Sequence, residues 1–536
     1  MHRFTWRLAV IVLLGWNNRY IPTAHAQYPA PAPVPAPQVA QAPARLPSVV
    51  PASMAYVNNL EMRIAELEAR LDRYAAEHKD EKAPKPAEGY EVGSDLAMTA
   101  KWNHGFELST KNKDFKVHVG GRVQSDTSWY SGNGNIENTV DLGGVGPLRD
   151  ATNMRRGRIR IDGTMYETMD FASEWDFVNE IRDVGAGSTQ ADAVAVPCPT
   201  DNWVQFKELP AVGNFRIGIL KDPWSFEHLT SSRWLNFMER SYGQDVFHGA
   251  FNNGFLPGAM FFDTMWEEHG TWWIGLFKNT NNIFANGVGD GELSTVGRLT
   301  WLPIYTDEGR YLLHFGVAAR ALALDEGRVR FRTRADIRSG APGPANPIFA
   351  NTGFIAGDNE QQIGTEVAGV WGPWSLQSEW FGAVVQDAST LANSTAAGLQ
   401  PPPGTPLGTY MAHGAYVEVH YFLTGESRPY NRKNAVFDRV IPFQNFFLVR
   451  NRETGCCYTG WGAWQLAGRY QFMDLNDSGV NGGVLDAFTL GLNWFWNPNT
   501  KVQFNYDYMD RNFVNTLGNN GNGTMSSFGG RLAFDF

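Results

Sequence analysis

A run of arginines between residues 155 and 162 offers the clearest chemistry in this chain. From Arg156 onward, charged and apolar residues alternate, and successive side chains of a strand point to opposite faces. One face would carry Arg156, Arg158, Arg160 and Asp162, and the other Ile159, Ile161, Gly163 and Met165. Guanidinium groups suit phosphate and carboxylate oxygens, and rings of arginine lining a pore select anions. The pattern predicts a membrane-spanning strand whose apolar face meets lipid. Its arginine face would line a water-filled lumen that binds anions.

A second run has the same period. It contains Arg328, Arg330, Arg332 and Arg334, and single arginines lie on other strand-like segments at Arg122, Arg298, Arg320, Arg469 and Arg531. An arginine on the lipid face near the bilayer midplane costs about 2–4 kcal/mol, so three would cost about 6–12 kcal/mol. We therefore expect the first run to face the lumen, with a rim position or structural pairing with Asp162 as the alternative. The second run is either another lumen ladder or a basic exposed loop.

The elements that would hold these arginines are short strands. Alternating segments recur from residue 101 to the C-terminus, for example over 115–124, 464–472, 488–496, 501–508 and 528–536. Clusters of Gly, Asn, Asp and Pro separate them, some short (496–500) and some long (131–150, 341–359, 388–408). Short turns at one end and long loops at the other are typical of outer-membrane barrels. About 435 residues at about 27 per strand and connection predict about 16 strands.

The N-terminal region has a different composition. Arg3 and Arg7, an apolar stretch over 8–15 and Ala24-His25-Ala26 predict a secretory signal peptide over 1–26. Residues 27–52 are rich in Pro and Ala and predict an extended linker. Heptad spacing predicts a coiled-coil helix over 53–78, with a helix packed on the barrel as the alternative. A second linker, 79–100, precedes the barrel region, 101–536. We expect an all-β, 16-stranded antiparallel transmembrane β-barrel preceded by a short N-terminal coiled-coil helix.

Composition and charge narrow the class further. The chain has 56 Gly, 19 Trp, 34 Phe and 18 Tyr, and barrels of the outer membrane combine aromatic girdles with glycine-rich turns. The formal net charge of −10 is a sum over the whole chain and does not exclude a basic lumen. Three cysteines, Cys198, Cys456 and Cys457, argue against a disulfide scaffold or a zinc site. We expect no cofactor, no metal and no nucleic-acid partner.

Four segments resemble the phosphate-selective porins of the O and P type. They are Met154 to Arg158, Gly218 to Ser241, Leu423 to Phe446 and Gly462 to Pro498. The resemblance implies a homotrimer of 16-stranded barrels that passes inorganic phosphate or other small anions across the outer membrane. It implies that Arg155 and Arg156 lie near the anion path, and it makes Lys221, Arg233 and Arg240 candidate contacts. Phe536 resembles the terminal aromatic of the assembly signal.

The resemblance has one departure that bears on the solute. The barrel region here has few lysines and relies on arginine, so passage of general or organic anions is an alternative to phosphate. The candidate anion path comprises Arg122, Arg155, Arg156, Arg158, Arg160, Lys221, Arg298, Arg320, Arg328, Arg330 and Arg332. The N-terminal segments would hold the trimer in register or reach the cell wall.

Other function classes make different demands on the sequence. A barrel enzyme would need a catalytic constellation of the Ser/His/Asp type, and no nucleophile-elbow, zinc-ligand or phosphate-loop motif occurs in the chain. We therefore expect no enzymatic activity and no catalytic residue. A non-selective or organic-solute pore, and an envelope tether anchored by the barrel, are the alternatives to an anion channel.

Overall fold

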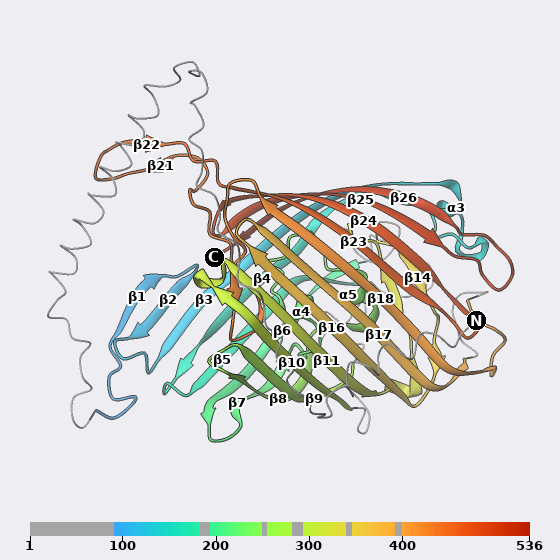
Figure 1. Cartoon of the computed structure of the whole chain (residues 1–536), viewed down its shortest axis with the longest axis horizontal. Helices are drawn as coiled ribbons and strands as arrows, with labels where there is room; N and C mark the ends of the chain where they lie inside the picture. Colours follow the sequence, from blue (N-terminus) through green and yellow to red (C-terminus); the bar gives the residue numbers. More distant parts are fainter. Residues whose placement is uncertain (1–89, 183–192, 249–253, 281–292, 339–345, 392–398) are drawn as a thin grey trace, which may run out of the picture. The chain divides into compact units, whose positions relative to one another are not determined.

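Long antiparallel strands close into one 16-stranded barrel in the computed structural model (Figure 1). In chain order the strands are β3 (Lys116–Gly132), β4 (Ala151–Met165), β5 (Met169–Arg182), β6 (Ala193–Leu209), β7 (Gly213–Leu220), β8 (Leu256–Met265), β9 (Gly270–Lys278), β10 (Leu293–Thr306), β11 (Tyr311–Ala323), β16 (Asn359–Trp371), β17 (Trp374–Thr390), β18 (Pro406–Phe422), β23 (Ala463–Asp477), β24 (Val480–Asn497), β25 (Thr500–Asn512) and β26 (Gly523–Asp535). Each pairs with its neighbours in chain order, and β26 pairs with β3 to close the ring. The predicted fold class and strand number are confirmed for the barrel.

The structure describes residues 90–182, 193–248, 254–280, 293–338, 346–391 and 399–536. Contacts divide the chain into two units, 1–88 and 89–536, and the description concerns the second. The predicted signal peptide (1–26), linker (27–52) and coiled-coil helix (53–78) lie outside the described residues. So does the linker predicted over 79–100, up to residue 89.

Alternation along the strands separates the two faces of the barrel wall. On β4, Arg158 is 7% exposed, whereas its neighbour Ile159 is 51% exposed. On β26, Arg531 is 2% exposed and Leu532 is 48% exposed. Apolar side chains therefore cover the outer face, where they meet lipid, and charged side chains point inward, as the period of two predicts.

The C-terminus completes the closure of the ring. The Gly121 N–H donates to the Phe536 carbonyl oxygen at 2.7 Å, and the Phe536 N–H donates to the Gly121 carbonyl at 3.1 Å. A Cβ atom on Gly120 would lie 2.5 Å from the Phe536 carbonyl oxygen, and one on Gly121 would lie 2.9 Å from the Phe536 ring. The two glycines are needed because the last residue of the chain lies directly against the first barrel strand.

The two ends of the barrel differ in their connections. At one end, short turns join β4 to β5, β6 to β7, β8 to β9, β10 to β11, β16 to β17 and β24 to β25. At the other end the connections are long, except for the tight hairpin between β23 and β24. The segment 423–462 between β18 and β23 is a long connection at the short-turn end, and it carries β19 (Tyr430–Asn431), β20 (Val436–Phe437), β21 (Val449–Arg450) and β22 (Cys457–Tyr458).

Smaller elements complete the described part of the chain. Strands β1 (Met98–Trp102) and β2 (Phe106–Thr110) extend the sheet at the start of β3, and the connection between β11 and β16 holds β12 (Arg328–Val329), β13 (Arg332–Arg334), β14 (Ile348–Asn351) and β15 (Ile355–Ala356). The helices are α3 (Gly134–Glu137), α4 (Phe226–Leu229) and α5 (Tyr242–His248), with 3-10 turns over Val140–Leu142, Asp307–Gly309 and Asp325–Gly327. None of the described helices is long and apolar enough to span a bilayer.

Candidate functional site

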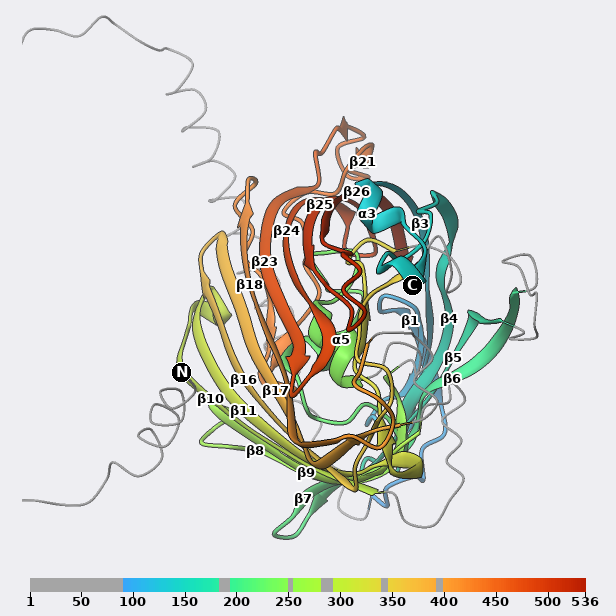
Figure 2. The same ribbon diagram turned by 90° about the vertical axis from the view of Figure 1, so that its right-hand side faces the viewer.

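The described parts of the connection from β7 to β8, residues 221–248 and 254–255, fold into the barrel, and we call them the inner segment. Figure 2 shows α5, part of this segment, enclosed by the ring of strands. The inner segment contacts the wall on several sides. Asn505 of β25 accepts from the Met238 N–H at 2.9 Å, and Gln471 of β23 accepts from the Tyr242 N–H at 2.9 Å. On another part of the wall, Arg320 of β11 donates to the Phe247 carbonyl. The inner segment therefore narrows the lumen.

Helix α4 has a local reason to start where it does. Ser225 caps it by accepting from the His228 N–H at 3.1 Å, a common role for serine at a helix N-terminus. The Glu379 carboxylate of β17 accepts from the N–H groups of Phe226 and Glu227 at 2.8 and 2.9 Å. A carboxylate at this position satisfies otherwise unpaired N–H groups and complements the helix dipole. The wall thus fixes the inner segment through its backbone.

A cavity of about 820 Å³, which we call the short-turn cavity, lies between the inner segment and the short-turn end of the barrel. Its lining contains ten Lys and Arg residues, namely Lys116, Arg122, Arg156, Arg158, Arg160, Arg216, Lys221, Arg233, Arg240 and Arg439. Only four carboxylate residues line it, Asp162, Asp201, Asp438 and Asp535. The lining therefore has a formal excess of six positive charges (10 − 4) in a chain whose net charge is −10.

The arginines of β4 are largely neutralised by neighbouring strands. Arg158 lies 2.6 Å from Asp176 and 3.0 Å from Glu174, both on β5. Arg160 lies 2.9 Å from Asp162 and 3.0 Å from Asp201 of β6. Arg122 of β3 lies 2.8 Å from Glu174 as well. Three guanidinium groups thus meet four carboxylates, so this part of the wall adds no net positive charge.

Arg155 and Arg156 reach the same carboxylate because β4 has an irregularity between them. The register shifts so that Gln124 pairs with Arg156 and Ser125 with Met154, which leaves Arg155 as an extra residue. A bulge of this kind re-aims a side chain that would otherwise point away from the lumen. Arg155 lies 2.9 Å and Arg156 lies 3.4 Å from Glu239 of the inner segment. The doubled arginine therefore anchors the inner segment.

Glu239 is shared by more cations than it can neutralise. Arg531 lies 2.8 Å and Arg338 lies 3.6 Å from it, in addition to Arg155 and Arg156. Burial alone would raise the pKa of Glu239, but the surrounding guanidinium groups hold it well below its usual value. The carboxyl group is therefore ionised, and positive charge remains in excess around it.

Three cations of the short-turn cavity are held by neutral partners. The Lys221 ammonium donates to the His228 carbonyl at 2.5 Å, and Arg240 donates to the Glu227 and Thr230 carbonyls at 2.8 and 2.6 Å. Arg216 donates to the Gln205 side chain at 2.6 Å and stacks 4.0 Å from the Trp203 ring centroid. Among the described residues, no carboxylate oxygen lies within 4.0 Å of these three cationic groups. No carboxylate of the described residues therefore cancels the charge of these groups when they are protonated.

Burial and mutual repulsion act on two of these groups. Burial, with the neighbouring Arg240 as the next cause, lowers the pKa of Lys221 well below its usual value. Burial also lowers the pKa of Arg240, to about 10, so its guanidinium remains charged at neutral pH. An anion that entered the cavity would stabilise the protonated form of Lys221.

A second cavity of about 320 Å³, which we call the long-loop cavity, lies on the other side of the inner segment. Arg320, Arg328, Arg330 and Arg332 line it, together with Asp222, Glu326 and Glu360. The second arginine run is not part of a barrel strand. It lies in the long connection between β11 and β16, divided between β12 and β13, and Arg328 pairs with Glu326. The run therefore belongs to a connection, but only Arg328 is exposed, and Arg328, Arg330 and Arg332 line the cavity.

The structure thus divides the predicted site residues into three groups. Arg122, Arg156, Arg158, Arg160 and Lys221 line the short-turn cavity, and Arg320, Arg328, Arg330 and Arg332 line the long-loop cavity. Arg155 and Arg298 line neither of these two cavities, and Arg298 lies 2.8 Å from Glu366. Arg216 was missed, although it alternates with Phe215 and Ile217 in the manner of the single arginines that were chosen.

The sequence is similar to two proteins over most of its length. The chain is 24% identical over 468 residues to Porin O of Pseudomonas aeruginosa, covering 83% of this chain and 93% of that protein. It is 25% identical over 466 residues to an uncharacterized protein of Caulobacter vibrioides, covering 85% of this chain and 80% of that protein.

Among solved structures, the chain is similar to OmpT of Vibrio cholerae (TM-score 0.42, 11% identity, 80% of this chain and 100% of that chain). It is also similar to an anion-selective porin from Comamonas acidovorans (TM-score 0.40, 9% identity, 79% and 100%). The closed ring of strand pairings, and not these distant likenesses, establishes the barrel.

A model of one family matches most of the barrel. The model for phosphate-selective porins O and P matches residues 117–536, from the first barrel strand to the last residue. This match confirms the resemblance carried by the doubled arginine and by the inner segment. The chain therefore belongs to the phosphate-selective porin O and P family and is a porin of the outer membrane.

Proposed function

We propose that this porin is an anion-selective channel whose selectivity comes mainly from the short-turn cavity. Membership of a porin family makes the chain a channel rather than an enzyme. The observation that supports anion selectivity is that Arg216, Lys221 and Arg240 line that cavity and, among the described residues, have no carboxylate partner. Clefts lined by one sign of charge concentrate ions of the opposite sign.

Within this cavity, Arg216, Lys221 and Arg240 would make the main contacts with the solute. Their charges are held by carbonyl oxygens, a side-chain amide and an aromatic ring, so they stay uncompensated. Guanidinium groups present a fork of donors that suits phosphate oxygens. The paired arginines Arg122, Arg158 and Arg160 would line the path and keep the wall rigid.

Inorganic phosphate or a related small anion is the solute that this chemistry fits best. A second candidate is an organic anion, because Trp203, Phe255, Phe262 and Trp273 line the same cavity. Aromatic faces beside guanidinium groups would bind an aromatic carboxylate through both stacking and charge. The channel would work as a homotrimer in the outer membrane, as the family resemblance implies.

Planar bilayer recording tests this proposal. With purified protein in a KCl gradient, we expect a reversal potential close to the equilibrium potential of chloride. Phosphate added to one side should reduce the chloride current at a lower concentration than benzoate does, whereas the reverse order would favour organic anions. A reversal potential near zero, or one of the sign expected for potassium, would refute anion selectivity. Migration of the native particle at three chain masses would support the trimer.

A further inference from the structure

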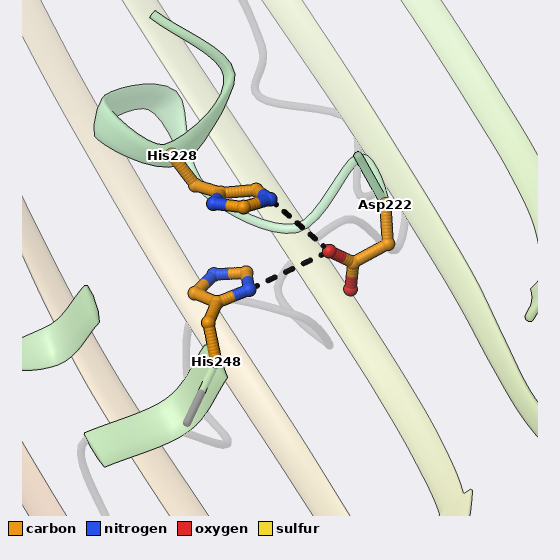
Figure 3. Close-up of side chains that lie close together, drawn as sticks. All are labelled: Asp222, His228 and His248. Carbon is orange, nitrogen blue, oxygen red and sulfur yellow. Dashed lines mark ion pairs between the residues drawn. The ribbon is translucent and has the colours of Figure 1, made fainter. Parts of the chain in front are cut away.

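The inner segment carries a cluster of two histidines and one aspartate. Asp222 follows β7 at the start of the inner segment, His228 lies on α4, and His248 is the last residue of α5 (Figure 3). All three are buried, with exposed fractions of 1%, 1% and 6%. Asp222 and His248 line the long-loop cavity and His228 lines the short-turn cavity. The cluster therefore lies in the partition between the two cavities.

The distances within the cluster are those of metal ligands. The Asp222 Oδ1 atom lies 3.4 Å from His228 Nε2 and 3.5 Å from His248 Nδ1. Hydrogen bonds from nitrogen to oxygen are shorter, about 2.7–3.2 Å. A tetrahedral zinc ion with bonds of about 2.0–2.1 Å separates its ligand atoms by about 3.3–3.4 Å. The ligand atoms of the three residues all lie within 4.8 Å of one another.

Neighbouring groups orient His228 and Asp222 so that their ligand atoms face the centre of the cluster. His228 Nδ1 lies 3.1 Å from Gln244 Oε1, an acceptor, and the tautomer with its proton on Nδ1 would donate to this oxygen and turn the lone pair of Nε2 to Asp222. Within the described residues, His228 Nε2 is a buried nitrogen with no hydrogen-bond partner. Arg320 lies 2.6 Å from Asp222 Oδ2, which leaves Oδ1 directed at the imidazoles. Second-shell contacts of this kind fix the orientation of metal ligands.

The alternative is that the two imidazoles, charged or neutral, are held to Asp222 by hydrogen bonds alone. The His228 and His248 ring centroids lie 3.8 Å apart, so two imidazolium charges would repel each other strongly. Two neutral rings could each donate one N–H to Asp222 Oδ1, but both contacts, at 3.4 and 3.5 Å, are longer than ordinary N–H to oxygen hydrogen bonds. A divalent cation would satisfy a lone pair from each histidine and the carboxylate at the same time.

We propose that Asp222, His228 and His248 bind a divalent transition-metal ion, such as Zn²⁺, in the partition between the two cavities. Imidazole nitrogen suits Zn²⁺, whereas Mg²⁺ and Ca²⁺ prefer oxygen ligands. Three protein ligands leave a fourth position for water or for a small anion from either cavity. The inference concerns the ion alone and does not depend on which solute the channel prefers.

Metal titration of the tag-free, full-length protein tests the inference. After removal of metals with a chelator, Co²⁺ should produce visible absorption bands of a tetrahedral site, and Zn²⁺ should abolish them at one ion per chain. His228→Ala and His248→Ala should each weaken Zn²⁺ binding by at least about tenfold. His413→Ala, which removes a half-buried histidine of β18 outside the cluster, should leave it unchanged.

Unchanged Zn²⁺ affinity in both cluster variants would overturn the inference, as would wild-type protein that binds no Zn²⁺. Anomalous diffraction from wild-type crystals soaked in Zn²⁺ gives an answer even if the variants fail to fold. We expect a single strong peak within bonding distance of the three side chains. A peak elsewhere, or none, would contradict the assignment.

Discussion

The arginines of β4 and the cations of the inner segment face the same cavity but differ in their partners. Arg158 and Arg160 are each held by two carboxylates at 2.6–3.0 Å. Lys221 and Arg240 donate to backbone carbonyl oxygens instead. An ion pair cancels its own field at a distance, whereas a carbonyl oxygen does not cancel the charge of a protonated cation.

The difference indicates that a run of arginines is not by itself an anion path. A regular ladder on one strand needs carboxylates on the next strands, because three unpaired guanidinium groups in a buried wall would be costly. A single cation on the inner segment can instead donate hydrogen bonds to backbone carbonyl oxygens of the same segment. We therefore expect substitutions in the two regions to have different consequences, one mainly for stability and the other mainly for selectivity.

The largest effect should follow the loss of Arg158. Arg158→Ser leaves Asp176 without its closest partner and Glu174 with Arg122 as its remaining close one, and breaking a buried pair costs about 3–5 kcal/mol. We expect a clear loss of unfolding free energy, measured by denaturant titration of the barrel in detergent. Selectivity should change little, because a buried carboxyl group left alone takes up a proton.

Replacing Arg156, Arg158 and Arg160 together with Ser should likewise weaken the barrel. If these arginines were an unpaired ladder in the anion path, the variant would lose selectivity and assemble normally. The pairs with Glu174, Asp176 and Asp201 lead to the opposite expectation. A variant of normal stability that has lost its anion preference would show that these arginines contribute to selectivity and are not mainly structural.

The next largest effect should be a loss of anion selectivity when the cations held by carbonyl oxygens and by a side-chain amide are removed. The triple change Arg216→Gln, Lys221→Gln and Arg240→Gln removes charge that no nearby carboxylate compensates. We expect the ratio of chloride to potassium permeability to fall by about tenfold, which corresponds to about 1.4 kcal/mol. Reversal potentials in a KCl gradient provide the measurement.

A matched control removes a cation together with its partner. Arg160→Gln combined with Asp201→Asn deletes one positive and one negative charge from the lining of the same cavity. The permeability ratio of this double variant should stay close to that of the wild type. If the double variant loses as much selectivity as the triple variant, pairing does not decide which cations matter.

A smaller effect should appear as a dependence on pH. The pKa of Lys221 is lowered mainly by burial, so this amine gains its proton only when the pH falls through that lowered value. Anion affinity should therefore rise as the pH falls. The contribution of Lys221 should be lost as the pH rises through the lowered pKa of this residue. Block of the chloride current by phosphate, corrected for the ionisation of phosphate, measures this slope.

The variant Lys221→Arg tests how much of the pH dependence comes from residue 221 and how much comes from neighbouring groups. The arginine stays charged, so the slope due to residue 221 should disappear. Burial and Glu418 raise the pKa of the nearby Glu227 to about 7, and its ionisation would leave a residual slope of the same sign. An unchanged slope in Lys221→Arg would assign the whole pH dependence to Glu227 and not to the lysine.

The sequence predicted the parts of this structure that depend on local pattern. Alternation along 156–165 placed Arg158 inside and Ile159 outside, since the two faces of a strand follow from a period of two. The spacing of turn residues predicted the number of strands. Resemblance to a family, more than any local pattern, singled out the inner segment through Lys221, Arg233 and Arg240.

The charge balance of the lumen could not be predicted in this way. Whether Glu174 or Asp201 meets an arginine depends on the register between strands, which the sequence does not display. The bulge at Arg155 is equally hidden, because Ser125 and Gln124 give no sign of it. His228 and His248 lie 6 and 26 residues after Asp222, a spacing that matches no short metal motif. Packing of the inner segment brings them together.

The most direct test is to locate anions in the wild-type channel. Crystals of the full protein soaked in bromide would show each bound anion by anomalous scattering. We predict the strongest bromide peaks in the lumen beside Arg216, Lys221 and Arg240. Peaks that follow Arg158 and Arg160 along β4, with none beside the inner segment, would contradict the assignment of anion binding to the cations without carboxylate partners.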